Sequence, residues 1–374
     1  MAQVQRDTRD GRWQARWRDP SGRQRKKSFR RRVDAQKWLD QHLAEMHRGQ
    51  YVDPSGSRML VGPIAEEWAA GLVHLKPSTA ARYRGVVKNH VIPSWGSWRL
   101  GSIGRQDIET WVGTLVARGL RPASIRQTYR VLSLILDAAV AHGRIGRNPA
   151  SGVRLPRVAA GEPVYLSAAE VGRLAVAAHP DDLAILVLAF TGLRFGELAA
   201  LRARRVDLVR GRLQITESVT EVQGKLEFTS PKTHQTRSVP VPATLLRRLA
   251  VIVTRLGPDD LVFTAPEGGT LRLRNWRARV FDPARERVEL GHLTPHDLRH
   301  TAASLAIAAG ANVKAVQRML GHASAAMTLD VYAGLFGDDL DAVGVALDRD
   351  VPQMCHIDPA GSSSTRCSSP GEVR

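Results

Sequence analysis

The sequence predicts a multidomain, mainly α-helical protein. A small β+α domain comes first, then an all-α domain, then a mixed α+β domain with a small antiparallel sheet. The 374 residues exceed one ordinary domain, and 43% of them are hydrophobic, which is enough for separate cores. Segments containing Pro, Gly and Arg interrupt the helical patterns at 51–61 and 148–162. Strand-like patterns are confined to the first thirty residues and to 205–241.

The charge of the chain favours a polyanionic partner. Lys and Arg total 54 against 36 Asp and Glu, which gives a formal net charge of +18. This balance is typical of nucleic-acid binding, with an anionic membrane surface as the second choice. No apolar run approaches the roughly 18 residues of a membrane span, and the N-terminal residues lack the apolar core of a signal peptide. We therefore expect a cytoplasmic protein that binds nucleic acid and no membrane.

Motif content argues against several classes of site. Both cysteines lie in the tail 350–374, which excludes a disulfide framework or a Cys-based zinc site in the folded body. His292, His296 and His300 have helical spacing that could mimic a metal-binding face. Pro295 interrupts that spacing, however, and no HExxH motif is present. No Walker A motif or Rossmann glycine fingerprint occurs either, so we expect no metal and no cofactor.

Residues 1–55 are predicted to form a small domain of strands and one helix. Alternation over 12–18 indicates a strand, 19–22 a turn, and 24–29 a second, returning strand. Residues 32–48 then follow a helical pattern. The candidate buried positions of this helix are Val33, Trp38, Leu39 and Leu43.

This N-terminal domain is strongly basic. Residues 1–50 hold 14 Lys and Arg against 6 Asp and Glu. A basic sheet that also carries Trp13 and Trp17 could lie in a DNA groove, and a solvated basic arm is the alternative. The candidate DNA-contacting residues of the domain are Arg12, Arg16, Arg18, Lys26 and Lys27.

Residues 62–148 are predicted to form an all-α domain of four helices. The second helix is expected to be capped by Ser78 and ended near Pro93, and the fourth to be capped by Ser124. Basic side chains on these helices together suggest phosphate contacts, although each taken singly is better explained as a solvated surface residue. The candidates selected for DNA contact are Arg82, Lys88 and Arg126.

Residues 163–348 are predicted to form the mixed α+β domain, and residues 350–374 a disordered tail. The patterns change from helix to strand and back to helix. Strands are expected at 212–219, 225–228 and 237–241. Helices are expected at 168–179, 181–201 with an interruption at 191–194, 243–256, 272–287, 295–309, 312–320 and 328–336.

Three residues of the last domain could meet at one phosphate. His296 and Arg299 stand three apart at a helix start, so their side chains share a face. Arg194 opens another helix. Two guanidinium forks on one phosphate would offset the charge that builds in a pentacoordinate transition state. By analogy with lost oxyanion donors, each should contribute roughly 3 kcal/mol.

Tyr332 is the candidate nucleophile for such a phosphate, although taken alone it could be a packing or surface residue. A free phenol has a pKa near 10, so only about one in a thousand is ionised at neutral pH. It therefore needs a base and a positive field, and His296 could supply the base. Lys232, in a predicted β-turn, could protonate the leaving oxygen. His322 could donate a hydrogen bond to a nonbridging oxygen.

The candidate residues lie in five short motifs, which are Thr191-Gly192-Leu193-Arg194-Phe195-Gly196-Glu197-Leu198, Pro231-Lys232-Thr233, His296-Asp297-Leu298-Arg299-His300-Thr301, Leu320-Gly321-His322 and Tyr332. In this order and spacing, the motifs resemble the tyrosine recombinase (phage integrase) family. The similarity of the catalytic motifs spans about 165–345. Residues 62–148 resemble the family's core-binding domain, and the first fifty residues resemble the arm-type DNA-binding domain of lambda-like integrases.

The resemblance implies a role for each position at the phosphate. Arg194 and Arg299 would clamp the scissile phosphate, and His322 would donate a hydrogen bond to it. Glu197 would support the pocket.

The resemblance also implies the proton transfers and the covalent step. Lys232 would protonate the leaving 5′ hydroxyl, and His296 would assist proton transfer. Tyr332 would form a 3′-phosphotyrosyl link. Because that link conserves the energy of the phosphoester, strand exchange would need neither ATP nor metal.

The leading hypothesis is a site-specific recombinase that integrates, and could excise, a phage or other mobile element in a bacterial cell. The resemblance implies a homotetramer on double-stranded attachment-site DNA at the nucleoid, with an excisionase and a DNA-bending host protein as candidate further partners. Residues 335–347 could dock on a neighbouring protomer or pack within their own chain. The alternatives are a DNA-binding regulator that never cuts and a type IB topoisomerase-like enzyme.

Overall fold

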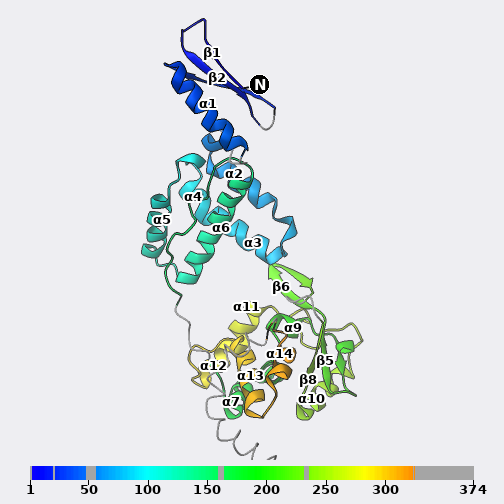
Figure 1. Cartoon of the computed structure of the whole chain (residues 1–374). Helices are drawn as coiled ribbons and strands as arrows, with labels where there is room; N and C mark the ends of the chain where they lie inside the picture. Colours follow the sequence, from blue (N-terminus) through cyan, green and yellow to red (C-terminus); the bar gives the residue numbers. More distant parts are fainter. Residues whose placement is uncertain are drawn as a thin grey trace, which may run out of the picture. The chain divides into compact units, whose positions relative to one another are not determined.

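The computed structural model describes residues 2–19, 22–47, 56–158, 164–230, 236–322 and 324. These residues are mainly helical with small antiparallel sheets, which confirms the predicted fold class. They divide into two units, whose elements are labelled in Figure 1. The first contains described residues of Met1–Glu162 and Glu217–Thr229, and the second those of Pro163–Thr216 and Ser230–Arg374. The domain boundaries drawn from the sequence stay predictions.

A three-stranded antiparallel sheet and one helix begin the first unit (Figure 1). The strands lie in the order β1-β2-β3, so the two predicted strands are present and a third precedes them. The first strand was missed because its residues are mostly polar and exposed and show no apolar alternation. The elements are β1 (Gln3–Arg6), β2 (Trp13–Arg18), β3 (Gln24–Phe29) and α1 (Arg32–His47).

A small core joins this sheet to α1. Ala15 and Trp17 of β2 pack against Ala35 and Trp38 of α1. Trp17 is only 4% exposed, so its side chain stabilises the core. The expectation that Trp17 could face a DNA groove is therefore wrong. Val33 was predicted to be buried but is 67% exposed. It lies two residues before Ala35 and therefore on the opposite side of the helix.

The helices that follow surround a separate hydrophobic core. This core includes Ala150 and Val153, so it continues past residue 148, where the all-α domain was predicted to end.

The described part of the chain has no helix with the length and hydropathy of a membrane span. The elements are η1 (Gly56–Arg58), α2 (Val61–Ala70), η2 (Leu72–His74), α3 (Pro77–Val86), the π-helical turn η3 (Val87–Val91), α4 (Ile92–Trp95), η4 (Leu100–Ser102), α5 (Arg105–Ala117) and α6 (Pro122–Ala141).

Proline, not serine, begins two of these helices. Pro77 and Pro122 are the first residues of α3 and α6, and the predicted caps Ser78 and Ser124 lie inside the helices. Proline suits a first turn because the N–H that it lacks would have no partner within the helix. Pro93 does not stop the helical path either: the π-helical turn η3 directly precedes α4, and Pro93 is the second residue of α4.

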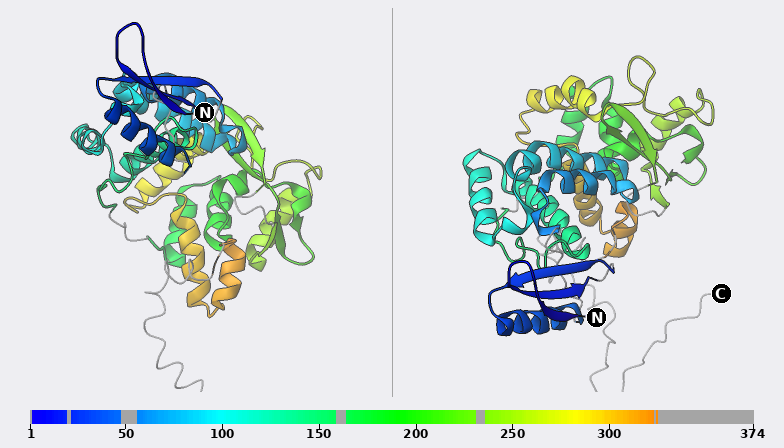
Figure 2. Two further views of the ribbon diagram at one scale, coloured as in Figure 1. Left: turned by 45° about the horizontal axis from the view of Figure 1, so that its top comes forward. Right: turned by 90° about the horizontal axis from the view of Figure 1, so that it is seen from above.

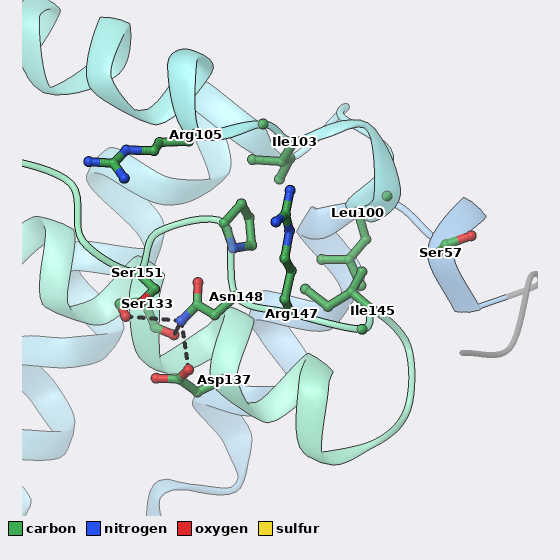
Figure 3. Close-up of a pocket in the computed structure, with 14 residues that line it drawn as sticks. Ser57, Leu100, Ile103, Arg105, Ser133, Asp137, Ile145, Arg147, Asn148 and Ser151 are labelled. Carbon is green, nitrogen blue, oxygen red and sulfur yellow. Dashed lines mark hydrogen bonds between the residues drawn. The ribbon is translucent and has the colours of Figure 1, made fainter. Parts of the chain in front are cut away.

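A cleft of about 890 Å³ opens in this helical part (Figure 3). Its wall includes the loop that follows α6. Asn148 of that loop donates from Nδ2 to Ser133 Oγ at 3.2 Å and to Asp137 Oδ1 at 2.6 Å, and both partners lie on α6. These bonds hold the loop against the helix.

Helices α8 and α13 pack together in the second unit, and α14 packs on both α13 and β8. Figure 1 and Figure 2 show α13 and α14 in orange beside each other. The elements are α7 (Ala168–Ala177), α8 (Asp182–Thr191), α9 (Phe195–Ala199), η5 (Ala203–Arg205), β4 (Val206–Asp207), β5 (Arg212–Ile215), β8 (Arg237–Pro240), α10 (Ala243–Val253), α11 (Leu273–Trp276), the π-helical turn η6 (Arg277–Phe281), α12 (Asp282–Arg287), α13 (Asp297–Ala308) and α14 (Val313–Leu320).

The single strand predicted at 212–219 is two strands. β5 lies in the antiparallel sheet of order β4-β5-β8, whereas β6 (Ser218–Val222) pairs with β7 (Lys225–Thr229) in a separate two-stranded hairpin. That hairpin groups with the first unit. The helix predicted at 328–336 and the tail 350–374 lie outside the described residues.

Candidate active site

Gly192 allows α8, α13 and α14 to meet. It ends α8 in the left-handed conformation, with φ of 65°. A Cβ atom here would lie 2.5 Å from Leu320 Cδ2 and 3.3 Å from Ala302 Cβ, so a larger residue would push these helices apart. The carbonyl of Gly192 accepts a hydrogen bond from Arg299 at 2.6 Å. The glycine of the Thr-Gly-Leu-Arg motif thus places the end of one helix directly on the guanidinium of another.

Arg194 is the N-cap residue of α9 and is held by Glu197, three residues later. The backbone N–H of Arg194 donates to Glu197 Oε2 at 2.9 Å, and its guanidinium donates from Nη1 to Oε1 at 3.0 Å. The Arg194 side chain remains 25% exposed, whereas that of Glu197 is 1% exposed. Glu197 therefore anchors an arginine whose charge still reaches solvent.

Arg237, which the sequence reasoning missed, is the second partner of Glu197. It donates from Nη1 to Oε1 at 2.9 Å and from Nη2 to Oε2 at 2.6 Å. Burial alone would raise the pKa of Glu197, but the hydrogen bonds and charge of Arg237, aided by Arg194, outweigh it and lower that pKa. A buried glutamate that stays ionised needs a counter-charge, but nothing in the sequence identified which arginine supplies it.

Arg299 is buried under the end of α14. Only 2% of the residue is exposed. Its Nη1 donates to the carbonyl of Gly192, and its Nη2 donates to the carbonyl of Leu320. A guanidinium is planar, so two bonds to carbonyls on different helices fix its orientation.

His296 precedes α13, whose start is fixed by Asp297. The Asp297 carboxylate accepts from both the N–H and the hydroxyl of Thr294, each at 2.7 Å. His296 and His300 stand one turn apart, with ring centroids 5.1 Å apart and the rings edge to face. Burial, the neighbouring His300 and Arg299 lower the pKa of His296, which favours a neutral imidazole able to accept a proton.

His322 follows the left-handed residue Gly321, which ends α14. Its backbone N–H donates to the carbonyl of Gln317 at 3.1 Å, and Gln317 Nε2 donates back to the His322 carbonyl at 3.0 Å. Burial lowers the pKa of His322 to about 4, with Arg299 and Arg194 acting in the same direction. A neutral imidazole still carries one N–H that can donate to a phosphate oxygen.

The structure brings four of the six predicted catalytic residues into one cluster. The charges of Arg194 and Arg299 both act on His296 and on His322, and the four residues come from the starts of α9 and α13 and the end of α14. Glu197 lies beside the cluster through its contact with Arg194. The other two, Lys232 and Tyr332, lie outside the described residues. The cluster therefore combines two arginines with two neutral imidazoles, a set suited to holding a dianionic phosphorus centre.

The N-terminal sheet separates the predicted DNA-contacting residues by face. Residues opposite each other in antiparallel strands share a face. Arg16 opposes Lys26, whereas Lys27 opposes the buried Ala15. Arg16 and Lys26 are thus on the face away from α1, and Arg18 joins them because side chains alternate along β2.

Lys27 lies on the helix side of that sheet. Its ammonium is 4.5 Å from the ring centroid of Trp38, a cation–π contact. Arg12 precedes β2 and is exposed. The remaining three candidates, Arg82 on α3, Lys88 in η3 and Arg126 on α6, are exposed as well, and Arg126 Nε donates to the carbonyl of Pro156 at 2.9 Å.

Comparison with known proteins links this cluster to one family. Residues 165–336 match the phage integrase family, and residues 65–116 match the SAM-like domain found at the N-terminus of phage integrases. A prophage phiRv2 integrase of Mycobacterium tuberculosis is 28% identical over 347 residues, which cover 89% of this chain and 92% of the relative.

Solved structures share the fold. The Tn1549 transposon integrase in complex with a circular intermediate DNA has a TM-score of 0.65 at 20% identity, covering 78% of this chain and 99% of its own. A lambda integrase tetramer bound to a Holliday junction has a TM-score of 0.57 at 20% identity, and the match covers 86% of this chain and 95% of the lambda integrase chain. The matched sequence segments and this shared architecture agree, and the chain belongs to the phage integrase family of tyrosine recombinases.

Proposed function

We propose that this protein is a site-specific DNA recombinase that cleaves and rejoins strands through a 3′-phosphotyrosyl link to Tyr332. The observation that carries the proposal is the cluster of two arginines and two neutral imidazoles around the end of α14. The substrate would be the attachment site of a phage or other mobile element, which the protein integrates and could excise.

The arginines would bind the scissile phosphate. Arg299 is rigid because two carbonyls hold it, and Arg194 is partly exposed at the start of α9. The fixed guanidinium of Arg299 and the accessible guanidinium of Arg194 together can contact both nonbridging oxygens of the phosphate. His322, neutral at physiological pH, would donate a third hydrogen bond. These groups act on the transition state because its charge exceeds that of the phosphodiester.

Proton transfer would involve His296 and Lys232. The lowered pKa of His296 leaves its imidazole neutral, and it could take the phenolic proton as Tyr332 attacks phosphorus. The bond from phosphorus to the 5′ oxygen breaks, and Lys232 would protonate that oxygen. Attack by a free 5′ hydroxyl reverses these steps. No high-energy cofactor is required, because one phosphoester replaces another.

The proposal is tested with a nicked suicide substrate that carries the attachment site and traps the covalent intermediate. The protein is incubated with it in the presence of a metal chelator, and the products are separated on a denaturing gel. We expect a protein–DNA adduct whose phosphate is joined to the 3′ end. Binding without any adduct would instead favour a regulator that never cuts. Adducts on unrelated duplexes at equal rate would favour a topoisomerase-like activity.

The role of Lys232 has a separate test in a substrate with sulfur in place of the bridging 5′ oxygen. A thiolate leaves without protonation, so Lys232→Ala should cleave the ordinary substrate about 10² to 10⁴ times more slowly than the wild type. The same variant should cleave the sulfur substrate at nearly the wild-type rate. The nearby Lys225→Ala in β7 is the matched control and should be unaffected on both. If the sulfur substrate does not restore cleavage, the acid is another group.

Assembly would follow the pattern named in the related structure, a tetramer on a Holliday junction. Four protomers would pair two duplexes, with 335–347 as the candidate docking segment. An excisionase and a DNA-bending host protein are proposed as further partners. Action on chromosomal attachment sites would place the protein at the bacterial nucleoid.

The N-terminal sheet is proposed to bind separate arm-type sites through Arg16, Arg18 and Lys26, which share the face of the sheet away from α1. Deletion of residues 1–55 should therefore abolish arm-site binding but leave adduct formation on a core-site substrate within a few-fold of the wild type. Gel-shift titrations on the two DNA sites, with adduct yields alongside, measure both effects. Equal loss on the two sites would contradict separate binding functions.

A further inference from the structure

Arg237 joins two parts of the site that the sequence places far apart. Its guanidinium bonds both oxygens of Glu197 near the start of α9, at 2.6 and 2.9 Å. Its Nε donates to the carbonyl of Met319 in the last turn of α14, at 2.9 Å. Only 7% of the Arg237 side chain is exposed. One strand residue therefore links the helix that Arg194 caps to the helix end that precedes His322.

The surroundings of Arg237 are closely fitted. Gly321 adopts the left-handed conformation with φ of 67°, and a Cβ there would lie 3.0 Å from Arg237 Cδ. The side chain thus packs directly under the turn from α14 to His322. Loss of the guanidinium would free the Met319 carbonyl and leave a space beneath that turn.

Arg237 also affects the charge that is available at Arg194. Glu197 carries one negative charge and touches two arginines, Arg237 through two hydrogen bonds and Arg194 through one from its guanidinium. Arg237 is the nearer partner, at 2.6 Å against 3.0 Å. With Arg237 present, the trio has a net charge of +1, and that charge is available at the more exposed Arg194. Without Arg237, the carboxylate of Glu197 would neutralise the charge of Arg194.

We propose that Arg237 is a positioning residue for recombination: it neutralises Glu197, so that Arg194 keeps its charge for the scissile phosphate, and it holds the end of α14 in place for His322. The inference rests on the proposed function, because it assigns Arg237 a part in cleavage of that phosphate. Arg237 itself need not touch DNA.

The test compares two versions of the suicide substrate in single-turnover cleavage. One has the ordinary phosphodiester, and the other an uncharged methylphosphonate at the scissile position. Arg237→Met should slow cleavage of the phosphodiester by about 100-fold, as misplacement of a catalytic group does, with DNA affinity retained. The loss on the methylphosphonate should be much smaller, because that substrate has less need of a free positive charge. A purely structural defect would slow both alike.

Two further variants keep the inference falsifiable if Arg237→Met folds poorly. Arg237→Lys retains the charge but not the two-oxygen contact, so it should lose less than Arg237→Met and keep the wild-type ratio between the substrates. Adding Glu197→Gln to Arg237→Met removes the unpaired carboxylate and should recover part of the lost rate. Arg248→Met, which removes an exposed ion pair of the same 2.6 Å length with Asp182, is the matched control.

The wild-type result separates the two claims. No adduct from the wild type would overturn the proposed function. Wild-type adduct combined with normal cleavage by Arg237→Met, or with equal losses on both substrates and no recovery by Glu197→Gln, would overturn the role of Arg237 and leave the proposed function standing.

Discussion

Tyr332→Phe is expected to abolish the covalent protein–DNA adduct while leaving DNA binding unchanged. The phenolic oxygen is the atom proposed to bond phosphorus, and phenylalanine keeps the ring but not that oxygen. Removal of a nucleophile in other covalent enzymes costs about 10⁶-fold in rate, so no adduct should be detectable on the suicide substrate. A gel shift with the same DNA measures binding separately.

Tyr165→Phe is the matched control in the same unit. Burial raises the pKa of Tyr165, which makes its phenol a poor nucleophile, so the variant should form adduct normally. Persistence of the adduct in Tyr332→Phe, or its loss in Tyr165→Phe alone, would refute the assignment of the nucleophile. Peptide mapping of the wild-type adduct should locate the phosphate on Tyr332.

Arg299→Lys is expected to reduce the single-turnover cleavage rate by about 10² to 10³-fold, in line with the loss of a transition-state donor. Lysine keeps the positive charge but cannot bond two carbonyls in fixed directions while it contacts a phosphate. DNA affinity should change little, because the overall charge is retained. The exposed Arg318→Lys, on the same helix end as Leu320, is the control and should cleave normally.

Arg299→Ala should also lower the stability of the fold. It leaves the buried carbonyls of Gly192 and Leu320 without their donor, at a cost of about 3 kcal/mol or more in the free energy of unfolding. Chemical denaturation without DNA measures this effect. Wild-type cleavage by Arg299→Lys would contradict a role at the phosphate, and an unchanged stability of Arg299→Ala would contradict the structural role.

Much of the fold was predictable because it depends on local patterns. The apolar spacing of α5 and α6 and the cap Ser167 before α7 are visible in the sequence, and the structure contains all three helices. The errors occurred where local signals conflict. Ser78 resembles a cap, but the neighbouring Pro77 begins the helix. β1 has no apolar alternation, because Val4 is its single apolar residue, although that side chain packs against the small core.

The residue types of the candidate site were predictable from the sequence. The contacts that hold those residues in place were not. His296 and Arg299 were expected to be neighbours because three residues form nearly one helical turn, and Arg299 does act on His296. The contact of Arg299 with Gly192 joins residues 107 positions apart, which no local spacing can show. Lys232 and Tyr332 remain sequence-based assignments.

The sequence by itself determined the fold class, the basic character and the residue types that a phosphate requires, because charge, periodicity and motif spacing are local properties. The tertiary structure alone decided that Arg299 is buried under two backbone carbonyls and that Glu197 is shared by Arg194 and Arg237. The physical reason is that a buried charge must be compensated wherever the fold brings a partner within hydrogen-bonding distance.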